Sequence, residues 1–210
     1  MIKTSVEFRN ISDLTVILIA KNRDTNLQYC LKSIACNTQV PPVILVDYGS
    51  DKPISVPEYP FVKVIRVNNK EFHKAHACNV GLRNVKTKYT CFTDVDEVFS
   101  PNFFEKLYKS VSSAPNLYIK CCTYGIHRTQ MDKIPITPDE VSTNYDALLS
   151  FALSLSTHLF GDGCCHCTTT EWFVTHRGFD EGFNGWGFED SFMSGLAIST
   201  GLKTAWLHNQ

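Results

Sequence analysis

Two uninterrupted apolar runs, separated by a helix-like pattern, constrain the fold of this chain most strongly. The runs are Leu14–Ala20 and Val43–Asp47, and each carries at most one polar side chain. Strands that are buried on both faces of a parallel sheet have this composition, whereas strands with one wet face alternate. Between the runs, Leu27 and Leu31 recur at helical spacing. The sequence therefore predicts strand–helix–strand units of a doubly wound α/β sheet.

The same alternation continues through the rest of the chain. Capping boxes are predicted at Thr25 with Gln28 and at Thr168 with Glu171. The segment 125–144 contains prolines and many polar residues, and we expect a loop there. Further strands are expected at 62–67, 89–93, 117–123 and 204–207, and further helices at 74–85, after Ser100-Pro101, at 146–156 and at 190–199.

Length and charge exclude several classes of protein. With 210 residues the chain is expected to form a single domain, 1–210. A net charge of −1 gives no electrostatic reason to expect a nucleic-acid partner. The chain contains no run of 18 apolar residues, so no transmembrane helix is predicted. A peripheral association with a membrane stays open. The first residues lack the apolar core of a signal peptide, so a cytoplasmic location is expected.

The chain has nine cysteines, an odd number. Cys30, Cys78, Cys91 and Cys121 fall in expected strands or on helix faces, where we interpret them as reduced, buried residues. The cluster at 164–167 reads Cys-Cys-His-Cys, which suggests a zinc site at first sight. Zinc sites usually pair their ligands two to four residues apart and add a second pair elsewhere. Because no second pair is evident, the zinc site is the weaker interpretation.

Two carboxylates follow the expected strand at 89–93. Asp94 and Asp96 are two residues apart at its carboxyl end, where ligands of doubly wound sheets collect. This arrangement can hold Mg²⁺ or Mn²⁺ against a diphosphate. The alternative is an acidic solvated turn. His208 follows the last expected strand, and an added histidine would favour Mn²⁺ over Mg²⁺.

A second group of chemically suited residues lies about 90 positions later, in Gly-Trp-Gly-Phe-Glu-Asp at 185–190. Trp186, between glycines, is placed to stack on a sugar ring. Asp190 opens an expected helix, whose dipole stabilises a carboxylate, so it suits either a general base or a helix cap. Glu189 would then hydrogen-bond an acceptor hydroxyl. Arg23, Asp47 and Lys74 could complete a nucleotide site, although each is individually an ordinary surface charge.

In this order, the motifs resemble those of GT-A glycosyltransferases of the family-2 type. Within that type, the C-terminal half is most similar to β-1,4-galactosyltransferases and bacterial chondroitin-type polymerases. The similarity is collinear over roughly residues 14–208. The matching residues are Asn22-Arg23, Asp47-x-Gly49-Ser50, Phe72-His73-Lys74-Ala75 with Asn79-Val80-Gly81, Tyr89-Thr90-Cys91-Phe92 before Asp94-Val95-Asp96, Gly185-Trp186-Gly187-x-Glu189-Asp190, and His208.

The resemblance implies a GT-A (Rossmann-like), mostly parallel sheet flanked by helices, with a smaller acceptor-side subregion. It also implies an inverting transfer of a hexose or N-acetylhexosamine from a UDP-sugar to a glycan or glycoconjugate, with Mn²⁺ (or Mg²⁺) as cofactor. A nucleotide-sugar-binding half at about 1–123 and an acceptor half at about 124–210 are expected. Because the chain ends two residues after His208, a C-terminal segment is expected to be missing.

The resemblance also assigns a role to each site residue. Asp190 is expected to be the catalytic base, and Glu189 with Trp186 to line the acceptor site. The metal ligands would be Asp96 and His208, with Asp94 supporting both metal and donor. The residues expected to hold UDP are Arg23, Asp47 and Lys74.

Two other functions remain as alternatives. A nucleotidyltransferase that makes nucleotide sugars would use a similar sheet, but it usually carries a glycine-rich basic loop after the first strand. Residues 21–24 read Lys-Asn-Arg-Asp, which is not glycine-rich. A non-catalytic glycan-binding module would have no need for the acidic residues at 94, 96, 189 and 190 together with His208.

Overall fold

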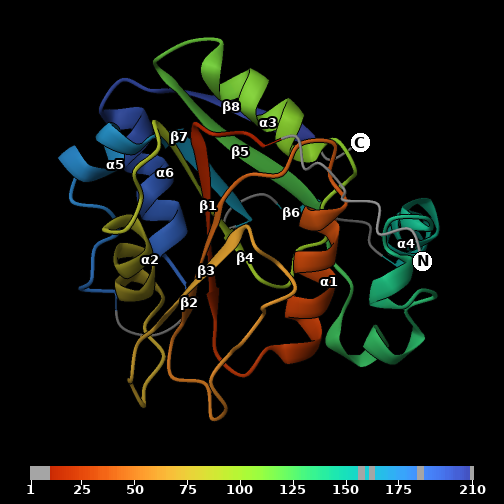
Figure 1. Ribbon diagram of the computed structural model, residues 1–210. Coiled ribbons are helices and arrows are strands. Elements are labelled where there is room, and N and C mark those ends of the chain that lie inside the picture. Colours follow the sequence, from red (N-terminus) through yellow and green to blue (C-terminus); the bar gives the residue numbers. More distant parts are fainter. Residues whose placement is uncertain (1–9, 156–158, 161–163, 184–186, 209–210) are drawn as a thin grey trace.

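The computed structural model describes residues 10–155, 159–160, 164–183 and 187–208. A central sheet with helices on both faces dominates the structure (Figure 1). The strands are β1 (Leu14–Ala20), β2 (Val43–Asp47), β3 (Val62–Arg66), β4 (Tyr89–Asp94), β5 (Leu117–Tyr124), β6 (Leu159–Phe160), β7 (Cys165–Thr169) and β8 (Lys203–His208).

The strand order of the sheet is β3-β2-β1-β4-β7-β5-β6, with β8 paired to β5. The pairs β1–β2, β1–β4, β2–β3 and β5–β8 are parallel, and the pairs that involve β7 or β6 are antiparallel. In register, Ile17 of β1 lies between Ile44 and Phe92, and all three side chains are buried. The apolar runs therefore form the two-faced parallel centre that the sequence predicted.

Helices cover the two faces unequally. On one face α1 and α3 pack on a core that includes Leu31 and Phe104. On the other face lie α2, α5 and α6 (Figure 1). The core beneath them includes Phe92, whose ring meets those of Phe173 and Phe179 edge-on at 4.9 Å each. The helices are α1 (Asp24–Ala35), α2 (Lys74–Leu82), α3 (Phe103–Ser112), α4 (Tyr145–Leu155), α5 (Thr170–Thr175), α6 (Glu189–Ser199) and the 3₁₀ turns η1 (Arg128–Lys133) and η2 (Pro138–Glu140).

The segment between β5 and α4 lacks long elements, as expected, but it has a small core of its own. Ile136, Val141 and Leu148 form a third apolar cluster against α1. The hydroxyl of Tyr29 in α1 donates to the Ile136 carbonyl at 2.8 Å. This subregion is therefore fastened to the first helix of the sheet-forming part of the chain.

The main departure from the sequence prediction is β7. The stretch 164–167, considered as a zinc site, contributes a strand that inserts between β4 and β5 and runs antiparallel to both. All nine cysteines are free, and the sulfurs of Cys91 and Cys165 face each other at 3.5 Å across β4 and β7. Within the described ranges no cluster of three metal-ligating side chains is present. Cys165 and Cys167 of β7 are buried packing residues, and Cys164 is partly buried.

Two predicted capping boxes are wrong. Thr25 lies inside α1, which begins directly after Arg23 and has no side-chain cap. Thr168 belongs to β7, where its hydroxyl donates to the carbonyl of Leu117 at 2.7 Å. The cap of α5 is the next residue, Thr169, because β7 continues one residue further than the sequence pattern suggests.

Candidate functional site

The carboxyl ends of β1, β2 and β4 meet at one edge of the sheet because these strands are parallel. Two turns are tied together there. The backbone N–H of Asn22 donates to the hydroxyl of Ser50 at 3.0 Å, and the N–H of Asp51 donates to the side chain of Asn22 at 2.8 Å. Gly49 has φ +76°, and a Cβ there would lie 2.1 Å from the carbonyl oxygen of Asn69. The Gly49-Ser50 motif is therefore required by the turn itself.

Asp47 holds this turn from inside. Its carboxylate accepts the N–H groups of Ser50 and Ile54 at 3.0 and 3.1 Å and pairs with Arg66 at 2.5 Å. Burial opposes its charge, but these hydrogen bonds lower the pKa of Asp47. The structure thus places Asp47 in the wall of the turn, fully buried.

The central feature of this edge is an ion cluster around Lys74, the first residue of α2. Its ammonium lies 2.8 Å from Asp190, 3.4 Å from Asp94 and 3.6 Å from Glu189. We call these four residues the Lys74 cluster. It brings together the end of β4 and the start of α6, which are almost 100 residues apart, as the motif order in the sequence predicted.

The charges of the cluster are unequal, with three carboxylates around one ammonium. Burial opposes the charge of Lys74, but Asp94 and Asp190 raise its pKa, so it stays cationic. Burial and the neighbouring carboxylates Asp96 and Asp190 raise the pKa of Asp94 to about 6, against the pull of Lys74. The site therefore has an excess of negative charge that a further cation would relieve.

Asp190 also contacts His166, a residue to which the sequence pattern assigned no role. Nε2 of His166 in β7 lies 3.0 Å from Asp190 Oδ1, and the hydroxyl of Tyr118 lies 2.5 Å from Nδ1 of the same ring. Burial lowers the pKa of His166, so the ring is neutral, accepting from Tyr118 and donating to Asp190. Burial opposes the charge of Asp190, but the bonds from His166 and Lys74 lower its pKa to about 2. Only the insertion of β7 next to β4 reveals this role.

The backbone before Asp190 is strained. Phe188 precedes α6 with φ +71°, a left-handed conformation that is uncommon for a large side chain, and its ring is 79% exposed. Asp190 is the second residue of α6 and not its cap. Glu189, the first residue, is buried.

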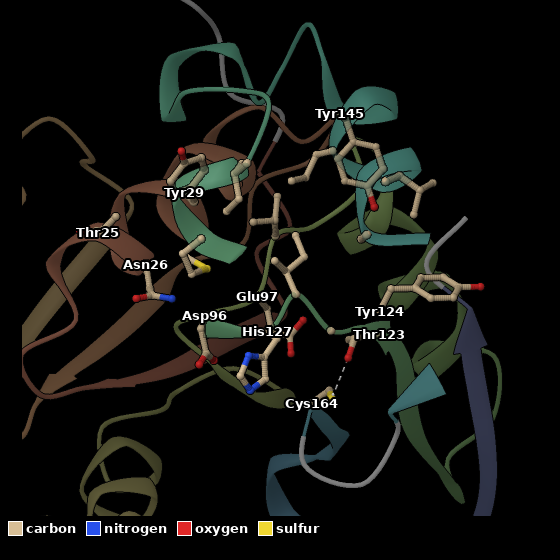
Figure 2. A pocket seen from close by; sticks show the side chains of 18 of the residues that line it. Thr25, Asn26, Tyr29, Asp96, Glu97, Thr123, Tyr124, His127, Tyr145 and Cys164 are labelled. Atoms are coloured by element: carbon tan, nitrogen blue, oxygen red, sulfur yellow. Dashed lines mark hydrogen bonds between the residues drawn. The ribbon is translucent and has the colours of Figure 1, made fainter. Parts of the chain in front are cut away.

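Asp96 and Arg23 lie on a different wall, that of a cavity of about 950 Å³ (Figure 2). We call it the large cavity. Glu97, also in its lining, was not singled out from the sequence. Burial and the charges of Asp94 and Asp96 raise the pKa of Glu97 to about 8. The sequence feature that could have identified Glu97 is its position directly after the Asp-x-Asp motif.

The residues at this edge fit a divalent cation by their chemistry. Asp94, Asp96 and Glu97 provide carboxyl groups within four positions of the chain, although no three metal-ligating side chains of the described residues converge on one point. Oxygen ligands of this kind suit Mg²⁺ and Mn²⁺. The backbone of His208 ends β8, which is paired to β5, while its side chain lies outside the described part. Trp186, the predicted stacking residue, also falls outside the described residues.

Comparisons with known proteins agree with this architecture. A family model described as glycosyl transferase family 2 matches residues 15–167. Among solved structures, Staphylococcus aureus TarS 1–349, also solved in complex with UDP, superposes with a TM-score of 0.68 at 12% identity, covering 94% of this chain and 58% of that one. A Pyrobaculum calidifontis mannosyltransferase, PcManGT, in complex with GDP-Man and Mn²⁺, gives 0.60 at 18% identity, covering 94% and 55%.

These likenesses establish the fold. The expected GT-A architecture is confirmed by both the sheet order and the matching structures. The chain spans less than two thirds of the length of these solved chains. No curated sequence matches it significantly. The similarity to β-1,4-galactosyltransferases and chondroitin-type polymerases stays a prediction. No helix in the described ranges is long and apolar enough to cross a membrane.

Proposed function

The chain belongs to glycosyl transferase family 2, and from this premise we propose that it is a metal-dependent, inverting glycosyltransferase. In this proposal it transfers a hexose or N-acetylhexosamine from a UDP-sugar to a hydroxyl of a glycan or glycoconjugate. The observation that carries the proposal is the Lys74 cluster. One ammonium there bridges a carboxylate of the predicted metal motif and two carboxylates of the predicted acceptor motif.

The donor would bind at the edge between β1, β2 and β4. Arg23, after β1, and Lys74 are the cations available for its diphosphate. We propose that Asp47 contributes to the nucleotide site by holding the turn after β2. Asp96, with His208 and with Asp94 in support, would hold Mn²⁺ or Mg²⁺. The ion would supply positive charge for the leaving diphosphate.

Asp190 is the proposed base. Without a donor, Lys74 and His166 occupy its two oxygens and keep its pKa low. A bound diphosphate would compete for Lys74, because both phosphate and carboxylate are anions. Release of Lys74 would free Asp190 Oδ2 and raise its pKa toward the range of a useful base. His166 would keep the other oxygen in place.

The reaction then has one bond forming and one breaking. The acceptor oxygen bonds to the anomeric carbon as the bond from that carbon to the phosphate oxygen breaks on the opposite face. Asp190 takes the hydroxyl proton, and the diphosphate leaves with the electron pair. Glu189, and Trp186 on the preceding loop, are proposed to orient the acceptor.

Calorimetric binding of UDP and of a panel of UDP-sugars, with and without Mn²⁺, tests the donor site. Binding is expected to require Mn²⁺ and to weaken at least about tenfold in Asp96→Asn, because the ion would lose a charged ligand. The matched control is Asp13→Asn, an exposed aspartate before β1 at the opposite edge of the sheet. If the affinity for UDP is the same with and without Mn²⁺ and is unchanged in Asp96→Asn, the proposal is contradicted.

A further inference from the structure

The large cavity has two chemically distinct ends. In Figure 2, Asp96, Glu97 and His127 gather at one end, near Thr123 and Cys164, while Tyr29 and Tyr145 lie toward the other. The apolar and aromatic members of the lining come from α1, the connection after β4, the 124–134 segment and α4. They include Tyr29, Val98, Ile126, Met131, Leu148 and Leu149.

Contacts within the chain hold the walls of the cavity in place. Leu148 belongs to the third apolar cluster, and Tyr29 and Ile134 pack against it. The Tyr29 hydroxyl binds the Ile136 carbonyl, and Lys32 pairs with Asp139 at 3.1 Å. Protein interiors are otherwise close-packed, so a preformed space of this size is typical of a ligand site.

The cavity adjoins the proposed donor site, since Arg23 and Asp96 are in its lining, and it extends away from that site. Its lining includes Asp96 but none of Lys74, Asp94 or Asp190. These three line a neighbouring space of only about 10 Å³, which is room for about one water molecule. A molecule in the large cavity would therefore meet the donor and its metal at Asp96, while the rest of that molecule extends toward α4.

The charges of the lining restrict the occupant further. Arg23 is the one lysine or arginine in the described lining, and the proposed function assigns it to the nucleotide. The remaining acidic groups are Asp96 and Glu97, and no further lysine or arginine of the described lining is available to pair with a phosphate or carboxylate of an acceptor. A neutral sugar needs no such partner and can hydrogen-bond at this end.

From these observations we propose that the large cavity binds the apolar aglycone of the acceptor, a neutral glycoside whose sugar lies where the cavity meets the Lys74 cluster, beside Asp190 and Glu189. The sugar lies at the Asp96 end, and the aglycone lies against Leu149 and its apolar neighbours. This inference rests on the proposed glycosyltransferase function. It narrows the acceptor from glycans in general to glycoconjugates whose non-sugar part is recognised.

Matched glycosides provide the test. Octyl, phenyl and methyl glycosides of the same sugar are titrated into the chain with UDP and Mn²⁺ present, below the micellar concentration of the octyl compound. The series is run for glucose, galactose and N-acetylglucosamine. The octyl or phenyl compound is expected to bind at least about tenfold more tightly than the methyl compound, because each buried methylene adds affinity. The octyl and phenyl arms separate lipid-like from aryl aglycones, and octyl phosphate is expected to bind more weakly than the octyl glycosides.

Variants locate the binding. Leu149→Trp fills the cavity and is expected to remove the preference for the apolar aglycone. Leu153→Trp is the control, because it lies on the same helix, is 47% exposed and is outside the lining. Met131→Trp, from the opposite wall, serves the same purpose if Leu149→Trp fails to fold.

The possible outcomes distinguish failure of the acceptor proposal from failure of the proposed glycosyltransferase function. If Mn²⁺-dependent UDP binding is intact and the methyl and octyl glycosides bind equally, the acceptor proposal is overturned and the donor site stands. A preference that survives in both tryptophan variants of the lining overturns it as well. If UDP does not bind to any form of the protein, the glycosyltransferase proposal fails, and with it the assignment of the cavity to an acceptor.

Discussion

The Lys74 cluster and the large cavity are neighbours, since Asp94 lines one and Asp96 the other, yet they differ in both charge and space. In the cluster, hydrogen bonds and ion pairs engage the ammonium and both oxygens of Asp190, and almost no free volume remains. The cavity is large, with polar and apolar surface in nearly equal parts, and has two carboxyl groups at one end. A tightly paired site holds charges ready for chemistry, whereas an open cavity selects a partner by shape.

The largest expected effect distinguishes these two roles. Asp190→Asn removes the proposed base and is expected to lower kcat by about 10³-fold, while UDP affinity stays within about twofold. Transfer rates and calorimetry measure both quantities. Asp146→Asn is the matched control, because Asp146 is the second residue of α4 as Asp190 is of α6. If Asp190→Asn transfers at the normal rate, the base lies elsewhere, and Glu97 in the large cavity becomes the candidate.

Removal of the Lys74 ammonium tests how much its ion pairs contribute to the stability of the fold. Lys74→Met leaves three carboxylates without their ammonium and is expected to lower the free energy of unfolding by about 3 kcal/mol at pH 8. Carboxyl groups with raised pKa values in the folded state stabilise it below about pH 4, and this stabilisation is lost as pH rises through the folded values. Because the pKa of Asp94 is already about 6, the deficit should shrink at pH 5.

Urea unfolding at pH 5 and pH 8 measures this deficit. The control is Lys32→Met, whose partner Asp139 is 92% exposed, so its loss should change stability by less than about 1 kcal/mol at either pH. Equal losses at both pH values in Lys74→Met would show that the variant lost packing and not charge compensation.

The smallest expected effect concerns Phe188, at the start of α6. Phe188→Gly relieves the left-handed backbone and is expected to raise the free energy of unfolding by about 1 kcal/mol. Phe188→Ala keeps the strain and should give no such gain. Reduced acceptor affinity in both variants would show that the exposed ring of Phe188, like the large cavity, takes part in acceptor recognition. A loss of stability in Phe188→Gly would instead mean that the ring packs.

The fold followed from local features of the sequence to a large extent. The runs at Leu14–Ala20 and Val43–Asp47 can be stable only where both faces are covered, so their place in the parallel centre was predictable. Polar residues after such strands were predicted to meet at one edge. The joining of Asp94 with Asp190 in one cluster agrees with that reasoning.

Other features had no sequence signal that distinguished them. β7 is short, cysteine-rich and antiparallel. Its cysteine and histidine residues suggested metal ligands and did not indicate a strand. With β7 missed, the contact of His166 with Asp190 could not be foreseen, nor the burial of Thr168. The hydrogen bonds of Asp47 within its turn and its ion pair with Arg66 also had no sequence signal, while its role at the nucleotide stays a prediction.

The sequence by itself determined the order of the elements and which carboxylates lie at the ends of buried strands. It did so because burial on two faces and the strand period are properties of consecutive residues. Tertiary structure alone decided the partners of Asp190 and the existence of the large cavity. Both depend on side chains from segments far apart in the chain, α1, the 124–134 segment, β7 and α4, whose packing is set by the whole fold.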